Sequence, residues 1–136
     1  ERLGAGRVVT LDPEAHDRAV AAISHLPLLA SVALAETVLG RPGEPVPLEA
    51  ATALRLAAGG WRDATRLARG DPAMGAGIVA TNRAAVAEGL RRFRLVVEDW
   101  VALLEADPVD EGAVAARLAA TRARLEGGPG DGEPLD

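Results

Sequence analysis

Apolar positions in the second half of the chain recur at helical intervals. Between residues 79 and 104 the steps are seven, four, three, four, three and four. The positions are Val79, Val86, Leu90, Phe93, Val97, Trp100 and Leu104. This spacing is typical of a helix face that packs against another helix. We call these seven positions the seam. The pattern leaves two partners open: a helix of the same chain, or a second copy of it.

A long helix is predicted near the start of the chain. Asp12 can cap the first free N–H groups, and Pro13 has no N–H to lose at that position. Helix-compatible residues then continue to Leu39, and Gly40 is a natural stop. Pro27 lies inside this stretch and removes one hydrogen bond of the ladder, so we expect a kink or a break there.

The rest of the chain also predicts helices. We expect a proline-rich loop, a helix ended by the Gly59-Gly60 pair, a short helical turn, a long helical region bent near Asn82, and a last helix. Their ranges are 40–47, 48–58, 61–70, 71–105 and 111–126. The predicted fold is all-α, with five or six helices of which two are long.

Composition excludes several classes of function. The 136 residues suit one domain, and the net charge of −5 does not favour nucleic-acid binding. There is no cysteine, which rules out disulfides and thiolate metal sites, and two histidines are too few for a histidine-rich site. We find neither a signal-peptide pattern nor an apolar run of about 18 residues. We therefore expect a cytoplasmic protein, part of a longer one, with no membrane partner.

A glycine motif in the chain does not support nucleotide binding. Residues 75–80, GAGIVA, match G-x-G-x-x-A. The dinucleotide fingerprint requires a preceding strand, whereas here the preceding Asp71-Pro72 is a helix start. We therefore expect this segment to be helical.

Two groups of polar residues are candidates for a site. His16 and His25 are nine residues apart and so face opposite sides of an ideal helix. His25 is the better candidate because a helix-breaking proline follows nearby; a structural or capping role is the alternative for either. Asp63 and Arg66 follow the Gly59-Gly60 pair at a predicted helix start, and spare N–H groups beside a guanidinium suit a carboxylate. The alternative is that they are solvated surface charges.

The order of these motifs resembles a known family. HDRAVAAISHLPLLASVAL is followed by GGWRDATRLARGDPAM and then by N-x₃-V-x₃-L. Over about residues 3–105 this resembles the C-terminal region of prephenate dehydrogenase. The resemblance implies a helical domain like the C-terminal domain of 6-phosphogluconate dehydrogenase, intertwined in a homodimer. It implies a linker end at 1–11 and the helical domain at 12–126. Residues 127–136 are rich in glycine and proline and acidic, which predicts a disordered tail. NAD or NADP, and the catalytic residues, would belong to an N-terminal domain absent from this chain.

The resemblance also implies a substrate site. The family oxidatively decarboxylates prephenate to 4-hydroxyphenylpyruvate in tyrosine biosynthesis. Arg66 matches the arginine that grips a substrate carboxylate, and Asp63, Gly59 and His25 match positions of the same pocket. Many relatives have histidine and tryptophan where this chain has Leu28 and Gly75. These two departures could reflect a preference for arogenate over prephenate, and by this reading the chain alone is inactive.

Two other functions stay open at this point. The seam is also compatible with a non-catalytic helical dimerisation or regulatory module. The chain could also be the helical domain of another NAD(P)-dependent dehydrogenase, such as a hydroxyacid type.

Overall fold

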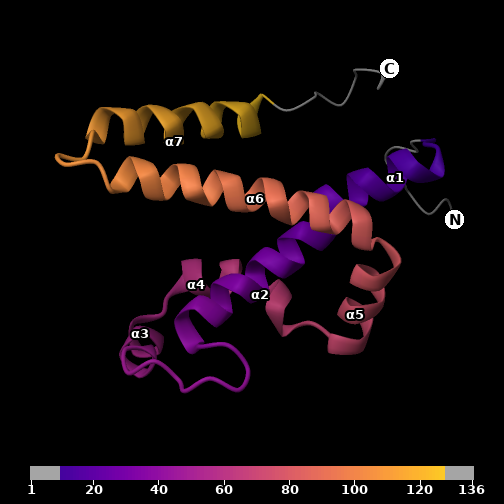
Figure 1. The fold of residues 1–136 in the computed structure, drawn as a ribbon, viewed down its shortest axis with the longest axis horizontal. Helices are drawn as coiled ribbons and strands as arrows, with labels where there is room; N and C mark the ends of the chain where they lie inside the picture. The colour runs from indigo at the N-terminus through magenta and orange to yellow at the C-terminus, as the bar shows by residue number, and fades with distance from the viewer. Residues whose placement is uncertain (1–9, 128–136) are drawn as a thin grey trace, which may run out of the picture. The chain divides into compact units, whose positions relative to one another are not determined.

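The computed structural model describes residues 10–127, and all regular structure within them is helical. The helices are α1 (Pro13–Val20), the π-helical η1 (Ala21–His25), α2 (Leu26–Leu39), α3 (Ala50–Leu56), α4 (Gly59–Ala64), the 3₁₀ turn η2 (Leu67–Arg69), α5 (Pro72–Thr81), α6 (Arg83–Leu104) and α7 (Glu111–Glu126) (Figure 1). The all-α prediction is confirmed for these residues. Most of the predicted linker end (1–11) and of the predicted tail (127–136) lies outside them.

The first long helix is continuous through α1, η1 and α2. Asp12 caps it, since its side chain accepts from the N–H of Ala15 at 2.8 Å, and Gly40 ends it with a φ of 83°. Of the kink or break expected at Pro27, the break does not occur. Instead, the N–H of Leu26 donates to the carbonyl of Ala21, five residues back, in the turn just before the proline. This wider turn accommodates a proline ring that would clash with the ordinary ladder.

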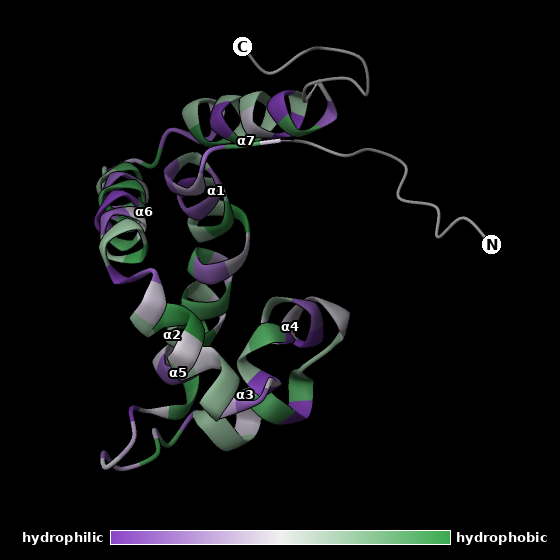
Figure 2. Ribbon diagram, turned by 90° about the vertical axis from the view of Figure 1, so that its right-hand side faces the viewer, coloured by the Kyte–Doolittle hydropathy of each residue, from purple (hydrophilic) through white to green (hydrophobic). Residues whose placement is uncertain are grey.

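The same helix corrects one expectation about composition. Residues Pro13–Leu39 contain an 18-residue window of mean hydropathy 1.6, with 17% of that window buried, which is long and apolar enough to cross a membrane by length and composition alone. Isolated polar residues interrupt the apolar run in this helix, so the sequence pattern did not indicate a span. They barely lower the mean hydropathy of an 18-residue window, which is why the window average is high. Figure 2 shows α2 largely in the colours of hydrophobic residues. A mostly buried core helix of a soluble domain and a signal sequence near the N-terminus pass the same test of length and composition.

The bend expected near Asn82 in the long region 71–105 is confirmed, because the backbone leaves helical geometry at this residue, between α5 and α6. A further boundary differs from the prediction. The helix expected at 48–58 is shorter, and Gly59 and Gly60 begin α4 as well as following α3. Glycine lacks a side chain that would favour one conformation, so the pattern alone does not show on which side of the pair a helix lies.

The chain consists of two compact units, one up to Arg92 and the other from Phe93 onward. In the first, α2 packs against η2 and α3. The start of α6 packs against the long helix at Gly89, where a Cβ would lie 3.5 Å from Leu26 Cδ2, an ordinary van der Waals contact. Val86, 2% exposed, is the largest fully buried side chain among the described residues.

In the second unit the end of α6 and α7 run antiparallel (Figure 1). The guanidinium of Arg117 lies over the ring of Trp100, 4.2 Å from its centroid, and donates to the carbonyl of Val96 at 3.5 Å. Asp110 caps α7 by accepting from the N–H of Ala113.

Much of the seam is exposed in the single chain. Phe93, Val97 and Leu104 are 40%, 42% and 57% exposed, whereas Val86 is buried. Val79 does not share the face, because it lies in α5 beyond the Asn82 break. An apolar face of this length along α6 is unusual for a helix that packs only within its own chain.

Candidate functional site

The first unit contains a cavity of about 580 Å³. It lies among η1, the start of α2, η2 and α5, and its polar lining residues are Ser24, His25, Arg66 and Asp71. Its apolar side includes Leu28, Leu29, Met74 and Ile78. A few polar groups facing an apolar wall are typical of a site for a small organic ligand. We call it the His25–Arg66 cavity.

Two buried hydroxyl groups hold the segment that carries Arg66. Ser31, 5% exposed, accepts from the backbone N–H of Ala68 at 3.1 Å and so ties η2 to α2. Thr65, 2% exposed, donates to the carbonyl of Trp61 at 2.7 Å. Arg66 lies between Thr65 and Ala68, which these two hydrogen bonds hold in place, so its backbone position against α2 is well defined.

The guanidinium of Arg66 is available for a ligand. Arg66 is exposed, and within residues 10–127 no carboxylate forms an ion pair with it, whereas Arg69 donates to the hydroxyl of Thr65. The sequence placed Arg66 at the start of the helix that follows the glycine pair; that helix, α4, ends before Arg66, which is instead the N-cap residue of the 3₁₀ turn η2. The guanidinium of Arg66 is the cation on the wall of this cavity.

His25 is held by a residue from a distant part of the chain. The side-chain amide nitrogen of Asn82 lies 2.7 Å from the carbonyl oxygen of Asp17 and 3.4 Å from Nδ1 of His25. Asn82 occupies the break between α5 and α6, while His25 ends the π turn. The π turn and the break between α5 and α6 are therefore in contact through Asn82 and His25.

The other predicted residues do not line the cavity. Asp63 and Gly59 are both exposed and absent from its walls. His16 is also exposed and contacts the carboxylate of Asp17 at 3.2 Å. The predicted separation of His16 from His25 thus agrees with the structure. Of the four residues assigned to the site, the structure brings His25 and Arg66 together at one cavity, and their binding role stays a prediction.

Two residues that support the site were not identified from the sequence. Asn82 was noted only as a bend and as the first residue of N-x₃-V-x₃-L, and Ser31 was not singled out. A lone serine in the middle of an apolar helix was the available signal, since a buried hydroxyl needs a partner. Neither partner could be deduced from spacing along the chain.

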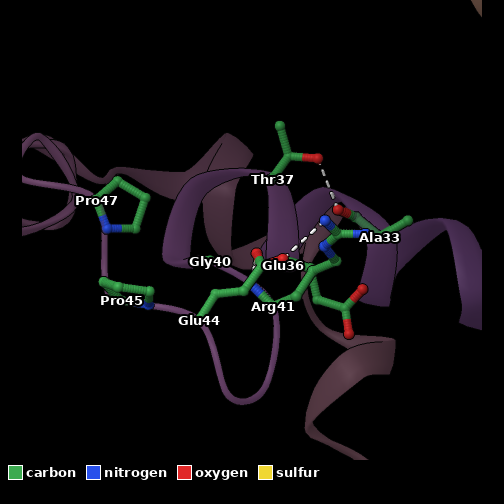
Figure 3. Close-up of a pocket in the computed structure, with 8 residues that line it drawn as sticks. All are labelled: Ala33, Glu36, Thr37, Gly40, Arg41, Glu44, Pro45 and Pro47. Carbon is green, nitrogen blue, oxygen red and sulfur yellow. Dashed lines mark hydrogen bonds and ion pairs between the residues drawn. The ribbon is translucent and has the colours of Figure 1, made fainter.

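Other hollows are less suited to a ligand. One of about 410 Å³ lies where α2 ends, with Glu36 and Thr37 on its wall (Figure 3). Its arginine, Arg41, is already paired with Glu44 at 2.7 Å. In the second unit a hollow of about 650 Å³ is lined by Trp100, whose ring face is covered by an arginine.

The glycine motif and the potential metal ligands can be placed in the described residues. The GAGIVA segment lies inside α5, so it forms no strand-to-helix turn that could hold a pyrophosphate. Residues 10–127 contain no cluster of three or more histidine or acidic side chains that could hold a metal ion.

Residues 12–120 match the family described as "Prephenate dehydrogenase, dimerization domain". The chain belongs to this family. The resemblance inferred from the motifs is thereby confirmed at the level of the domain. Comparison with curated protein sequences gives no significant match.

Solved structures of the same fold agree with this assignment. The arogenate dehydrogenase of Synechocystis superimposes with a TM-score of 0.78 at 27% identity, covering 88% of this chain and 41% of that one. Prephenate dehydrogenase from A. aeolicus, in complex with hydroxyphenyl propionate and NAD⁺, gives 0.69 and 27%, covering 88% and 40%. A putative prephenate dehydrogenase from Corynebacterium glutamicum gives 0.66 and 27%, covering 83% and 33%. The chain thus spans between a third and about two fifths of these proteins.

Proposed function

We propose that this domain forms the dimer and part of the substrate site of an enzyme that oxidatively decarboxylates prephenate, or the related arogenate, with NAD or NADP. The observation that carries the proposal is that His25 and Arg66, which belong to separate family motifs, line one cavity. In the proposed enzyme this chain supplies no cofactor-binding or catalytic residue. By itself it is expected to be inactive, and the nicotinamide site belongs to a nucleotide-binding domain linked to residues 1–11.

The cavity offers each part of such a substrate a matching surface. Arg66 can form charge-assisted hydrogen bonds with a carboxylate, which are the stronger class of hydrogen bond. His25 adds a polar edge, and the apolar side formed by Leu28, Met74 and Ile78 suits a cyclic carbon skeleton. Asp63 and Gly59 then act only indirectly, through the α4 segment that leads to Arg66.

Prephenate and arogenate differ in their side chains. Prephenate has a keto acid side chain, and arogenate has an amino acid side chain whose ammonium group needs an acceptor. Asp71 lines the cavity, and its Oδ1 accepts the N–H of Met74 at 2.7 Å. Both substrates therefore stay within the proposal, and turnover of each has to be measured.

A second candidate function is a helical dimerisation or regulatory module without catalysis, favoured by the exposed seam on α6. A third is the helical domain of another NAD(P)-dependent dehydrogenase. For all three we propose a homodimer in the cytoplasm, with neither nucleic acid nor a membrane as partner.

The test is the activity of the full-length protein. Prephenate and arogenate are each offered with NAD and with NADP, and reduced nicotinamide is followed by absorbance. Turnover of either substrate supports the proposal, and no turnover in all four mixtures rejects it. Turnover of simple hydroxyacids instead would support the third candidate. The 136-residue chain serves as the control, and measurable turnover by it would contradict the assignment of the cofactor site to another domain.

A further inference from the structure

The amide of Asn82 has a defined orientation. Its side-chain nitrogen lies 2.7 Å from the carbonyl oxygen of Asp17, and a carbonyl can only accept. The NH₂ group must therefore face this carbonyl, since the opposite orientation would place two oxygens together. One N–H is then directed to Asp17, and the second remains for the neighbour at 3.4 Å, Nδ1 of His25.

This orientation determines which nitrogen of His25 carries a proton. A neutral imidazole has one donor nitrogen and one acceptor nitrogen, and its neighbours decide which is which. Because the group that faces Nδ1 is a donor, Nδ1 has to accept, and the proton lies on Nε2. The 3.4 Å contact is longer than the bond to Asp17 and so weaker, but it is the only side-chain hydrogen bond of His25 among the described residues.

We propose that Asn82 is a positioning residue that holds His25 as the Nε2–H tautomer, so that the histidine acts as a neutral hydrogen-bond donor in the His25–Arg66 cavity. The ligand chemistry that follows is one cation and one neutral donor, which suits an acid with a second acceptor oxygen. This part rests on the proposed function, whereas the tautomer itself does not.

The two helical irregularities are the structural basis of this contact. Asn82 leaves helical geometry between α5 and α6, so its side chain is not confined to a helix face. The π turn shifts the register of the long helix between Asp17 and His25, and one amide reaches both. The π turn lies directly before Pro27, whose ring it accommodates.

The test is the ¹⁵N spectrum of the histidines in protein labelled at both ring nitrogens, recorded at a pH where the rings are neutral. His16 is the internal reference, because its Nδ1 lies 3.2 Å from a carboxylate, which only accepts. We expect His25 to show a protonated Nε2 and His16 to favour a protonated Nδ1. A His16→Gln variant assigns the signals. A protonated Nδ1 in wild-type His25 would overturn the proposal.

Variants of Asn82 complete the experiment. In Asn82→Asp the carboxylate accepts, so the proton of His25 should move to Nδ1, and in Asn82→Ala the two tautomers should mix. Thr81→Ala is the matched control, since its hydroxyl bonds only to carbonyls of its own helix, and it should leave the spectrum unchanged. If His25 keeps the same tautomer in Asn82→Asp and Asn82→Ala as in the Thr81→Ala control, Asn82 does not set the tautomer.

A second readout connects the tautomer to binding. In the full-length enzyme, Asn82→Asp should move the proton of His25 to Nδ1, so that Nε2 presents a lone pair to the carboxylic acid substrate. KM for prephenate should then rise about tenfold while kcat changes less. If the full-length protein has no dehydrogenase activity, the proposed function fails and the tautomer result still stands. If KM is unchanged while the tautomer has moved, His25 is not a donor to the substrate.

Discussion

Leu28 and Gly75, the two positions that the resemblance in the sequence sets apart from many relatives, lie next to each other in the folded domain. Both line the His25–Arg66 cavity, and a Cβ at position 75 would lie 3.6 Å from Leu28 Cδ2, an ordinary van der Waals distance. The two differences therefore alter one wall rather than two unrelated places. Here that wall consists of an apolar side chain beside an unfilled position in α5.

Filling this space should weaken substrate binding. We expect Gly75→Leu in the full-length enzyme to raise KM for prephenate or arogenate at least fivefold, because the new side chain would occupy cavity volume beside Leu28. Steady-state kinetics with both substrates measures this. The larger effect should fall on the substrate that the enzyme prefers.

Gly77 provides the matched control for that substitution. It lies in the same helix, does not line the cavity, and a Cβ there would meet nothing within 4 Å. Alanine at either position should stabilise the domain by up to about 1 kcal/mol, because glycine is a poor helix former. A Gly77→Leu variant with the same rise in KM as Gly75→Leu would show that the effect comes from the helix and not from the cavity.

Removal of the guanidinium should affect substrate binding and leave the cofactor alone. We expect Arg66→Ala to raise KM for prephenate at least tenfold, the loss of one charge-assisted hydrogen bond, with the affinity for NAD unchanged. Arg66→Lys should recover only part of this, since an ammonium lacks the planar fork. Arg62→Ala is the control, because Arg62 is exposed in α4 and lies outside the cavity lining. An unchanged KM in Arg66→Ala would remove Arg66 from the site.

The hydroxyl of Ser31 should matter for stability. Ser31→Ala leaves the N–H of Ala68 without its partner in a partly buried place, so the free energy of unfolding should fall by about 1–3 kcal/mol. Thr37→Ala in the same helix is the comparison, since Thr37 is exposed and bonds only to the carbonyl of Ala33. Urea denaturation of both variants measures the difference. Equal stability would mean that the Ser31 bond does not hold η2 against α2.

A charge on the seam should disrupt the dimer. We expect the protein to sediment as a dimer at micromolar concentration and Val97→Glu to produce monomer, because burial of an unpaired carboxylate in an apolar interface is unfavourable. Arg91→Glu, on the opposite side of α6, should remain dimeric. Dimerisation that persists in Val97→Glu would place the interface elsewhere, and a monomeric wild-type protein would contradict the homodimer itself.

The sequence alone determined the features that depend on neighbouring residues. Asp12 and Asp71 mark helix starts because an aspartate can cap only the N–H groups of the next turn, and both do so. The order of the motifs was enough to recognise the family. Boundaries were less certain at Gly59 and Gly60, where glycine fits either side of a helix end.

Only the tertiary structure decided which side chains meet. Spacing along a helix placed His25 but could not show that Asn82, far along the chain, would face it, because that contact requires both the π turn and the break before α6. Helical spacing likewise could not show that Leu28 lies beside Gly75, or that the hydroxyl of Ser31 accepts the N–H of Ala68. Helical periodicity depends on a few consecutive residues, whereas a cavity depends on how whole helices pack, and the same periodic pattern allows many packings.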